Sequence, residues 1–323
     1  MNADIIAVTI IYNNYMITDY LIKKIIEQKQ KVKALIVIDN SLEVDQVKVE
    51  ELLKNKIRIY YIKSKYNIGA SGGYSLGMKL AKDMDAEFIW LNDSDGYPEK
   101  YCLSTMLKNY DESIRIIVPR KYEPKRLELL EMDYSHKNKF GKLISSRKKN
   151  FSDATIATSS TGLLIHKNVV MEIGYYDYNN YFVGFEDIDY CLRLRKKKIH
   201  INISNDSIYY HPNLIDKHNL GFNLTNQLKH YLPFYLGSDF QQERFKRAVY
   251  SASFLYGKYF NAWEIFITFI YSAIRTIISK YCSEERIIKL YVKGIKEGRK
   301  ERKCIYKKSI SKNIIDYEIT NNY

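Results

Sequence analysis

The 323-residue sequence has only four cysteines and five prolines, and it lacks a long uninterrupted apolar run. The cysteines form no C-x-x-C pair and lie at no zinc-site spacing from a histidine, which fits a reducing cytoplasm. The most apolar segment, 262–278, is interrupted by Glu264 and Arg275. A spanning helix needs about 20 largely apolar residues, so we expect none, with an interfacial helix as the alternative. The N-terminus lacks signal-peptide features, and we expect a cytoplasmic protein.

The sequence has few acidic residues relative to basic ones: 37 Asp and Glu compared with 51 Lys and Arg, which gives a net charge of +14. Such a charge suggests a polyanionic partner: nucleic acid, an anionic membrane surface or a phosphate-bearing substrate. The excess is concentrated in 286–312, where eleven basic against two acidic residues leave a local charge of +9. This segment is either a membrane-surface anchor or the solvated face of a packed helix.

Apolar runs with β-branched residues alternate with helix-like segments over the first 120 residues. The predicted strands are Ile5–Ile11, Ala34–Ile38, Ile57–Ile62, Glu87–Leu91 and Ile114–Val118. The predicted helices are Tyr15–Gln28, Leu42–Lys54, Gly73–Asp83 and Pro98–Tyr110. Strands that are apolar throughout and alternate with helices are typical of a parallel sheet covered on both faces. We therefore expect an α/β fold with a doubly wound, mainly parallel sheet.

The later sequence is less regular. Residues 120–150 are polar and rich in lysine, which predicts an insertion and suggests a lid. Further predictions are a strand or strand pair at 154–166, helices at 166–173 and 184–198, and two short strands within 199–212. From about residue 222 the pattern is helical. We expect a boundary near residue 220, between an α/β domain over 1–220 and a helical, basic region over 221–323.

Polar or flexible residues follow each of the first four predicted strands, starting at Tyr12, Asp39, Asn67 and Asp93. Ligands of such sheets bind at the carboxyl ends of the strands. The four segments therefore indicate one shared site along that edge.

Asp93 and Asp95 lie in the stretch "WLNDSDGYP" after the fourth strand. Residues i and i+2 of an extended segment point to the same side, so the two carboxylates suit one hard divalent cation. The alternative is a turn, in which Asp93 or Ser94 caps a helix that begins near Pro98. Their position at the binding edge leaves the two interpretations evenly balanced.

The stretch "NIGASGGYSLG" precedes a predicted helix, and Gly69, Gly72 and Gly73 would let the backbone approach a phosphate or a sugar. The alternative is a tight helix entry. The spacing matches neither a Walker loop nor the dinucleotide fingerprint.

Three acidic residues open the predicted helix at 184–198. Asp189 and Arg193 have the i, i+4 spacing of an intrahelical ion pair, which leaves Glu186 and Asp187 as candidates for a general base. His211 ends another apolar run, and its imidazole would complete a shell for Mn²⁺ with two carboxylates. Taken alone, a histidine is more often structural.

These features together resemble inverting glycosyltransferases of family two, with the GT-A fold, and in particular the subgroup of bacterial galactofuranosyl- and rhamnosyltransferases. The resemblance covers about residues 4–215 and rests on "VTIIYNN", "VIDNS", "NIGASGGYSLGMKLA", "WLNDSDGYP" and "GYYDYNNYFVGFEDIDYCLRL". A weaker resemblance continues into "LYVKGIKEGRKERK". Ser94 and Asn92 depart from the pattern, and "LKHYLPFY" (228–235) lacks the Arg-Asn of an acceptor motif.

The resemblance implies a role for each matching residue. Donor binding would involve Tyr12, Asp39, Asn67, Gly72, Gly73 and Asp93, with Tyr12 and Asp39 at the nucleobase. Asp93, Asp95 and His211 would hold Mn²⁺ or Mg²⁺, Asp187 would be the catalytic base, and Glu186 and Gly162 would lie on the acceptor side.

The implied activity is metal-dependent transfer of a hexose from a UDP- or dTDP-linked donor to a saccharide or lipid-linked acceptor in bacterial surface polysaccharide synthesis. Such acceptors would bring the enzyme to the inner face of the plasma membrane. A sugar-phosphate nucleotidyltransferase is one alternative, although "IYNNYMITDY" lacks the expected Gly-rich loop with Arg and Lys. A non-catalytic basic nucleic-acid-binding protein is the other, but no such motif is present, and we expect no nucleic-acid partner.

Overall fold

The computed structural model describes residues 3–124, 127, 133–137, 143–145, 157–211, 239–266, 270, 284–303 and 317–321. The strands are β1 (Ile5–Ile11), β2 (Ala34–Asp39), β3 (Ile59–Ser64), β4 (Phe88–Asn92), β5 (Tyr97–Pro98), β6 (Ile116–Tyr122), β7 (Asp133–Lys137), β8 (Leu143–Ser145), β9 (Ala157–Thr158), β10 (Leu164–His166), β11 (Asn202–Tyr210) and β12 (Tyr317–Asn321). The helices are α1 (Tyr15–Ile26), α2 (Gln46–Leu53), α3 (Gly69–Asp83), α4 (Cys102–Lys108), α5 (Lys167–Ile173), α6 (Glu186–Lys196), α8 (Asp239–Tyr259) and α10 (Glu284–Lys303).

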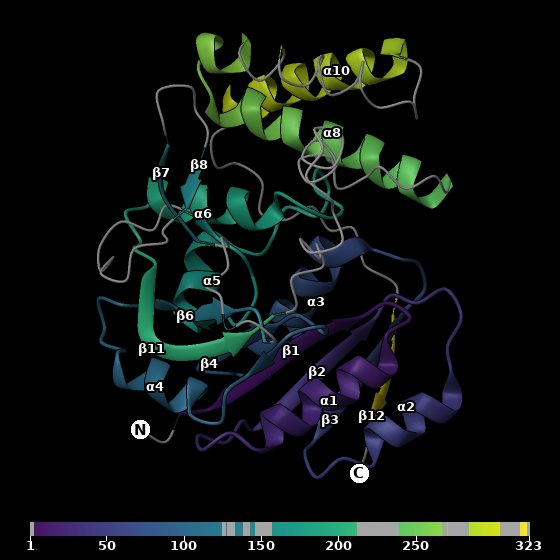
Figure 1. The fold of residues 1–323 in the computed structure, drawn as a ribbon, viewed down its shortest axis with the longest axis vertical. Coiled ribbons are helices and arrows are strands. Elements are labelled where there is room, and N and C mark those ends of the chain that lie inside the picture. The colour runs from purple at the N-terminus through teal and green to yellow at the C-terminus, as the bar shows by residue number, and fades with distance from the viewer. Residues whose placement is uncertain are drawn as a thin grey trace.

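Within the described residues, one large sheet has the strand order β12-β3-β2-β1-β4-β10-β6-β11-β5 (Figure 1). The pairs of β1 with β2 and β4, of β2 with β3, and of β6 with β11 are parallel. β10 lies antiparallel between β4 and β6, and β12 and β5 are antiparallel edge strands. The predicted α/β fold with a mainly parallel sheet is confirmed.

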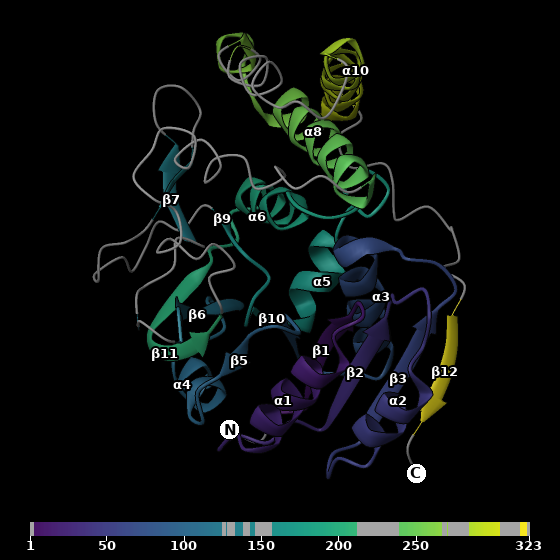
Figure 2. The same cartoon turned by 45° about the vertical axis from the view of Figure 1, so that its right-hand side comes forward.

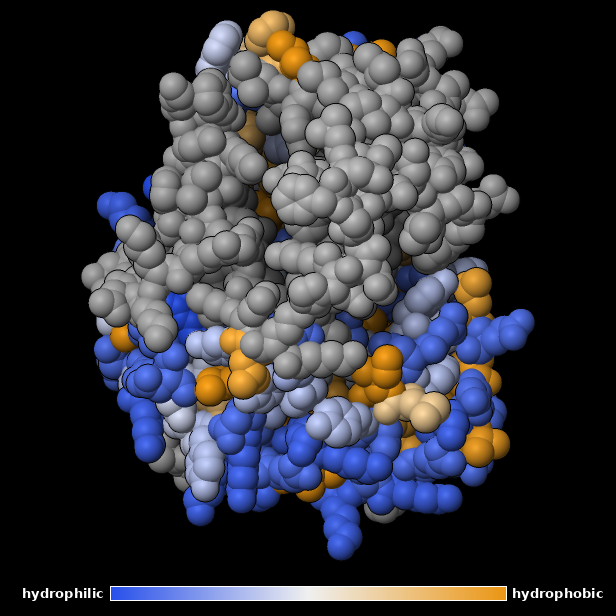
Figure 3. Space-filling view, in the orientation of Figure 1, coloured by the Kyte–Doolittle hydropathy of each residue, from blue (hydrophilic) through white to orange (hydrophobic). Residues whose placement is uncertain are grey.

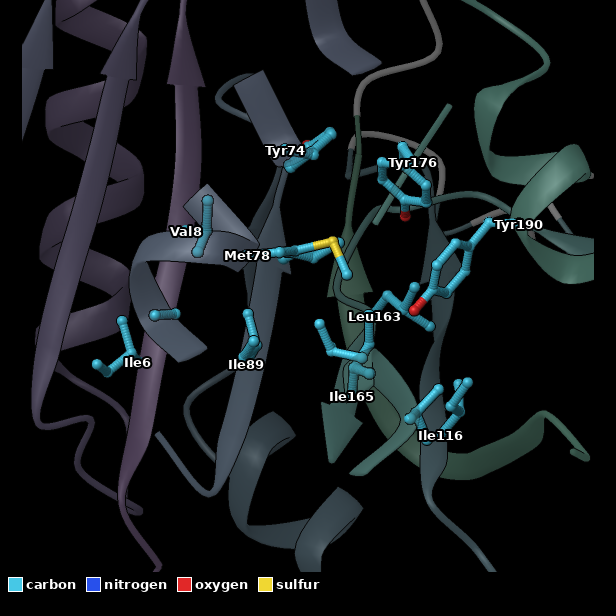
Figure 4. Close-up of a cluster of buried hydrophobic side chains, with 14 of the residues drawn as sticks. Ile6, Val8, Tyr74, Met78, Ile89, Ile116, Leu163, Ile165, Tyr176 and Tyr190 are labelled. Atoms are coloured by element: carbon cyan, nitrogen blue, oxygen red, sulfur yellow. The ribbon is translucent and has the colours of Figure 1, made fainter. Parts of the chain in front are cut away.

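Both faces of the sheet are covered, which explains why its strands are apolar throughout. One face packs against α1, α2 and α4, and the other against α3, α5 and α6. Figure 4 shows the core on the face covered by α3, α5 and α6. There Met78 of α3 lies among side chains of the sheet, such as Ile89, and Tyr176 and Tyr190 lie on the same side of the sheet. Close packing explains Gly77 of α3, because a Cβ there would overlap with the side chain of Val8 on β1.

The segment after Asp95 differs from the prediction of a helix beginning near Pro98. Tyr97 and Pro98 form β5, which pairs with Tyr209 and Tyr210 at the end of β11. An edge position tolerates proline, which lacks a backbone N–H for a central strand. Helix α4 begins only at Cys102, after Tyr101 and without a side-chain cap. The alternative interpretation, in which Asp93 or Ser94 caps this helix, is therefore wrong.

The two short strands predicted within 199–212 are a single strand, β11. The polar residues between them do not break the strand, because the pairing register with β6 shifts between Ser204 and Ile208. Such a bulge accommodates extra residues while the pairing continues on either side.

The predicted insertion at 120–150 contains strands where it is described. β7 pairs with β8 and β9 in a small three-stranded sheet. Within 120–150, the structure describes residues 120–124, 127, 133–137 and 143–145, and the rest of the proposed lid lies outside the described residues. The expected domain boundary near residue 220 also lies outside them.

α8 and α10 lie against each other at the top of the molecule, on the side of α6 (Figures 1 and 2). Glycines permit the close approach: a Cβ at Gly294 would overlap with Ser253, and one at Gly298 with the carbonyl of Phe254. None of the helices that the structure describes is long and apolar enough to span a membrane.

A buried carboxylate ties α8 to the rest of the molecule. The wholly buried Asp189 accepts hydrogen bonds from Arg193 Nε at 2.9 Å, Lys258 Nζ at 2.8 Å and the hydroxyl of Tyr259 at 2.8 Å. The hydroxyl of Tyr181 adds a weaker bond at 3.3 Å. Burial alone would raise the pKa of Asp189, but the charges of Arg193 and Lys258 hold it below its usual value. The predicted pair with Arg193 is thus part of a larger network that joins α6 to α8.

We expect Asp189→Asn to lower the free energy of unfolding by about 3–5 kcal/mol, because Arg193 and Lys258 would lose a buried counter-charge. Urea unfolding followed by circular dichroism measures the change. Asp83→Asn is the matched control, since it breaks an i, i+4 pair with Lys79 that is exposed on both sides. It should change stability by no more than about 0.5 kcal/mol. Equal effects of the two substitutions would contradict the role of Asp189.

Candidate active site

The ends of the first four parallel strands meet at one pocket of about 490 Å³. Its lining residues follow β1, β2, β3 and β4, or belong to the start of α3, the segment before α6, and α8: Ile10, Tyr12, Asn14, Asn40, Leu42, Asn67, Gly69, Ala70, Tyr74, Asp93, Ser94, Asp95, Phe182, Val183 and Arg247. The structure thus brings residues that follow all four strands to one pocket at this edge of the sheet.

Asp93 and Asp95 line this pocket, and His211 lies against both of them. His211 Nε2 lies 3.1 Å from Asp95 Oδ1 and 3.6 Å from Asp93 Oδ2. The pairing of β5 with β11 explains the contact, because it fastens the turn after β4 beside the residue that follows β11. Gly96 is needed in that turn, since a Cβ there would approach the ring of Tyr209 to 2.7 Å.

Two further side chains donate hydrogen bonds to the carboxylate of Asp93. The hydroxyl of Tyr74 donates to Asp93 Oδ1 at 2.5 Å, and the hydroxyl of Thr161 donates to Oδ2. Burial alone would raise the pKa of Asp93, but the bonds and charge of His211, with those from Thr161 and Tyr74, lower it to about 2. The carboxylate is therefore fixed in orientation and ionised at neutral pH.

The three side chains suit a divalent cation. One ligand atom from each of Asp93, Asp95 and His211 lies within 4.8 Å of the other two. Carboxylate oxygens with one imidazole nitrogen match Mn²⁺, and carboxylates alone serve Mg²⁺. Burial would lower the pKa of His211, but the neighbouring carboxylates of Asp93 and Asp95 raise it to about 10. A cation would take the place of that proton between the two acids.

Asp39 lies behind the pocket and does not line it. It is wholly buried, and its carboxylate accepts bonds from the hydroxyls of Tyr15 at 2.7 Å and Tyr61 at 2.5 Å and from the backbone N–H of Ser41 at 2.7 Å. The next residue, Asn40, does line the pocket, and its amide donates to the carbonyl of Gly69 at 2.9 Å. Asp39 therefore fixes the strand end that carries Asn40.

The other predicted donor residues divide into two groups. Tyr12 and Asn67 line the pocket, and Asn67 Oδ1 accepts a bond from the N–H of Gly69 at 2.9 Å. Gly72 and Gly73 lie in the first turns of α3, which begins at Gly69 and not at Gly73 as predicted. Both are buried. A Cβ at Gly73 would approach Ile10 of β1 to 2.9 Å, so this glycine allows the helix to pack closely on the sheet, whereas a Cβ at Gly72 would approach the side chain of Ile68, just before the helix, to 2.8 Å.

Glu186 and Asp187 begin α6, directly after Phe185, whose backbone is left-handed with φ 73°. Burial raises the pKa of both carboxyls, and the charge of Asp93 raises them further. Glu186 Oε2 has no hydrogen-bond partner among the described atoms, whereas Asp187 Oδ1 accepts a bond from the N–H of Ile188 at 2.7 Å. A carboxyl with a raised pKa near an acidic cluster is suited to proton transfer.

Gly162 lies beneath the acidic cluster. Its φ is 73°, and a Cβ there would approach Pro119 to 2.7 Å and Tyr209 to 2.9 Å. Its carbonyl accepts a bond from Trp90 Nε1 at 3.2 Å, and its neighbour Thr161 donates to Asp93. These contacts hold the loop against the site.

Tyr74, Thr161 and Arg247 are among the site residues that were not predicted from the sequence. Tyr74 is one of thirty tyrosines, and Arg247 is one of 51 basic residues. Only their three-dimensional contacts distinguish them.

An open, mainly parallel α/β sheet with acidic residues at its carboxyl edge is the arrangement of GT-A glycosyltransferases. Two solved structures have a similar fold. GalNAc-T7, solved with UDP, GalNAc and Mn²⁺, aligns with a TM-score of 0.59 and 11% identity over 93% of this chain and 56% of that one. TarS of S. aureus aligns with a TM-score of 0.51 and 13% identity over 92% and 55%.

The family model "Glycosyl transferase family 2" matches residues 6–174, and the chain belongs to that family of glycosyltransferases. Galactofuranosyltransferase GlfT1 of Mycolicibacterium smegmatis is 27% identical over 197 residues, which are 58% of this chain and 64% of the relative. GlfT1 of Mycobacterium tuberculosis is 26% identical over 194 residues, or 55% and 60%. The match thus spans about three fifths of the length of these curated relatives.

We expect Asp95→Asn to weaken Mn²⁺ binding by roughly tenfold or more, because it replaces a charged carboxylate ligand at the cation site with a neutral amide. Isothermal titration calorimetry with MnCl₂ measures the affinity. Asp95 is a sharper test than Asp93, whose substitution would also disturb Tyr74 and Thr161. Asp206→Asn, at an exposed carboxylate on β11, is the control and should leave the affinity unchanged. Wild-type affinity in the Asp95 variant would refute this assignment.

Proposed function

We propose that the protein is a metal-dependent inverting glycosyltransferase that moves a hexose from a UDP- or dTDP-linked donor to a hydroxyl of a saccharide or lipid-linked saccharide. The observation that carries the proposal is the cluster of Asp93, Asp95 and His211, of which the two aspartates line a pocket on the carboxyl edge of the sheet. The names of the GlfT1 relatives make galactofuranose the first donor sugar to test, and bacterial surface polysaccharide synthesis the proposed setting.

The nucleotide end of the donor would lie where β1, β2 and β3 end. Tyr12 and Asn67 line that part of the pocket and are proposed to contact the nucleoside. Asp39 would act on the nucleobase through Asn40, whose position it fixes. Gly72 and Gly73 would contribute by setting the close approach of α3.

Mn²⁺ or Mg²⁺ would be held by Asp93, Asp95 and His211, and when bound it supplies positive charge that stabilises the departing nucleoside diphosphate. Tyr74 and Thr161 keep the carboxylate of Asp93 in place for this role. Because their hydrogen bonds are already made, little reorganisation is needed during the reaction.

Asp187 is the proposed base. Its carboxylate takes the proton of the acceptor hydroxyl while that oxygen forms a bond to the anomeric carbon and the bond from that carbon to the diphosphate oxygen breaks. The attack comes from the face opposite the leaving group, which inverts the configuration, through a transition state of oxocarbenium character. Glu186 and Gly162 are proposed to lie on the acceptor side.

The test is a screen of purified protein with Mn²⁺ against UDP- and dTDP-linked hexoses, including UDP-galactofuranose, with release of nucleoside diphosphate as the readout. The wild type should turn over one of them, and Asp187→Asn should keep donor binding while losing about 10²–10⁴-fold in turnover. Because the pKa of Asp187 is raised and the base must be ionised, activity should fall as pH drops through a midpoint above the ordinary carboxyl value.

Glu186→Gln is the matched comparison at the adjacent carboxyl. Burial and then the charge of Asp187 raise the pKa of Glu186 to about 8, above the value of about 6 for Asp187, so Glu186 is protonated while Asp187 titrates. A neutral glutamine should therefore keep turnover above that of Asp187→Asn and leave the midpoint of the pH profile near its wild-type position. Near wild-type turnover by Asp187→Asn would remove it as the base, and no response to any nucleotide sugar would refute the function.

A second part of the proposal concerns membrane association. The buried side of α10 includes Tyr291 and Ile295, as expected for a packed helix. Packing does not account for exposed apolar side chains in and before α10, among them Trp263, Phe266 and Ile288. Figure 3 shows hydrophobic surface at the top of the molecule, where these helices lie. Apolar side chains near exposed basic residues of α10, such as Lys289 and Lys293, suit the anionic inner face of the plasma membrane.

We expect the protein to sediment with liposomes that contain anionic lipid, because each basic residue near the surface adds about 1 kcal/mol. Binding should weaken with added salt and in Trp263→Ser/Phe266→Ser, which removes two exposed aromatic rings. Liposomes of neutral lipid are the control. Failure to sediment with anionic liposomes at low salt would rule out the anchor and leave α10 as a packed helix with a solvated face.

A further inference from the structure

Arg247 of α8 lines the same pocket as the acidic cluster, although it lies far from that cluster in the sequence. It is exposed, and its guanidinium carbon lies 4.1 Å from the ring centroid of Phe182, which also lines the pocket. Among the described residues that line the pocket, Arg247 carries the cationic side chain, whereas Asp93 and Asp95 carry negative charge. The helical region therefore contributes a cation to a pocket that is otherwise acidic.

The ring of Phe182 gives the arginine a fixed support. The carbonyl of Phe182 accepts a bond from the N–H of Ser71 at 3.4 Å, and a Cβ at Gly69 would overlap with that carbonyl. Phe182 thus lies directly against the start of α3. A guanidinium stacked on an aromatic face keeps its N–H groups available for an anion.

The position of α8 is fixed by contacts on the same face of the helix as Arg247. Residues 247, 250, 254 and 258 follow at helical spacing. Phe254 packs against Tyr181, with ring centroids 5.6 Å apart, and Lys258 binds Asp189. The network around Asp189 therefore sets where Arg247 meets the pocket.

We propose that Arg247 binds the diphosphate of the nucleotide donor and so completes the donor site from the helical C-terminal region. This inference rests on the proposed function, because it assumes a nucleoside-diphosphate ligand. A diphosphate carries more negative charge than one divalent cation beside two carboxylates can balance. Guanidinium groups bind phosphate oxygens through two parallel, charge-assisted hydrogen bonds. Arg247 thus has the charge, the geometry and the location that the diphosphate requires.

The test compares UDP with uridine in the presence of Mn²⁺ by calorimetry and competition, with dTDP and thymidine in parallel. Arg247→Ala should weaken binding of the diphosphate by roughly tenfold to a hundredfold, because a charge-assisted bond is lost. Binding of the nucleoside should be unchanged, and Arg247→Lys should restore part of the diphosphate affinity. Arg195→Ala, at an exposed arginine of α6 away from the pocket, is the control and should bind both ligands normally.

Each outcome decides between the alternatives. Unchanged UDP and dTDP affinity in Arg247→Ala overturns the role of Arg247 but leaves the proposed function intact. Equal losses for diphosphate and nucleoside, or a lowered melting temperature, show that the residue only supports the fold. A wild-type protein that binds no nucleotide with Mn²⁺ refutes the proposed function itself, and the role of Arg247 with it.

Discussion

The arrangement of this molecule depends on one buried charge, that of Asp189. A carboxylate without exposure to water is costly unless it is paired, and here Arg193 from its own helix and Lys258 from α8 supply the positive charge. Because Lys258 belongs to α8, its ion pair with Asp189 holds α8 against α6. α6 begins with Glu186 and Asp187, so the same buried charge supports both the fold and the candidate active site.

Most of the sheet could be predicted because its strands are local patterns that need no knowledge of their neighbours. Runs such as Ile5–Ile11 are apolar on both sides since helices cover both faces. The predictions failed where pairing with a distant segment decides the structure. Pro98 suggests a helix start but lies in an edge strand against β11, and the polar residues within β11 suggest a break but are accommodated in a bulge.

The same distinction applies to the site. Spacing and strand ends made Asp93, Asp95 and His211 candidates, and the resemblance to family-two glycosyltransferases implied their shared metal role. The structure brings the three side chains together. Tyr74 and Thr161 could not be predicted, because nothing near them in the chain reveals that both donate to Asp93. Asp39 shows the opposite case: its motif predicts a ligand contact, yet three protein groups occupy its carboxylate, and Asn40 lies at the pocket instead.

The distribution of charge links these observations. Burial and the charge of Asp93 raise the pKa of Asp187, which suits a base. The same acidic cluster opposes the entry of a negatively charged donor. A cation between Asp93, Asp95 and His211 would offset part of that repulsion, and Arg247, which lines the same pocket, would offset more. Lys258, which binds Asp189, belongs to the same helix as Arg247, so the buried charge that anchors the fold also supports the helix that brings this cation to the pocket.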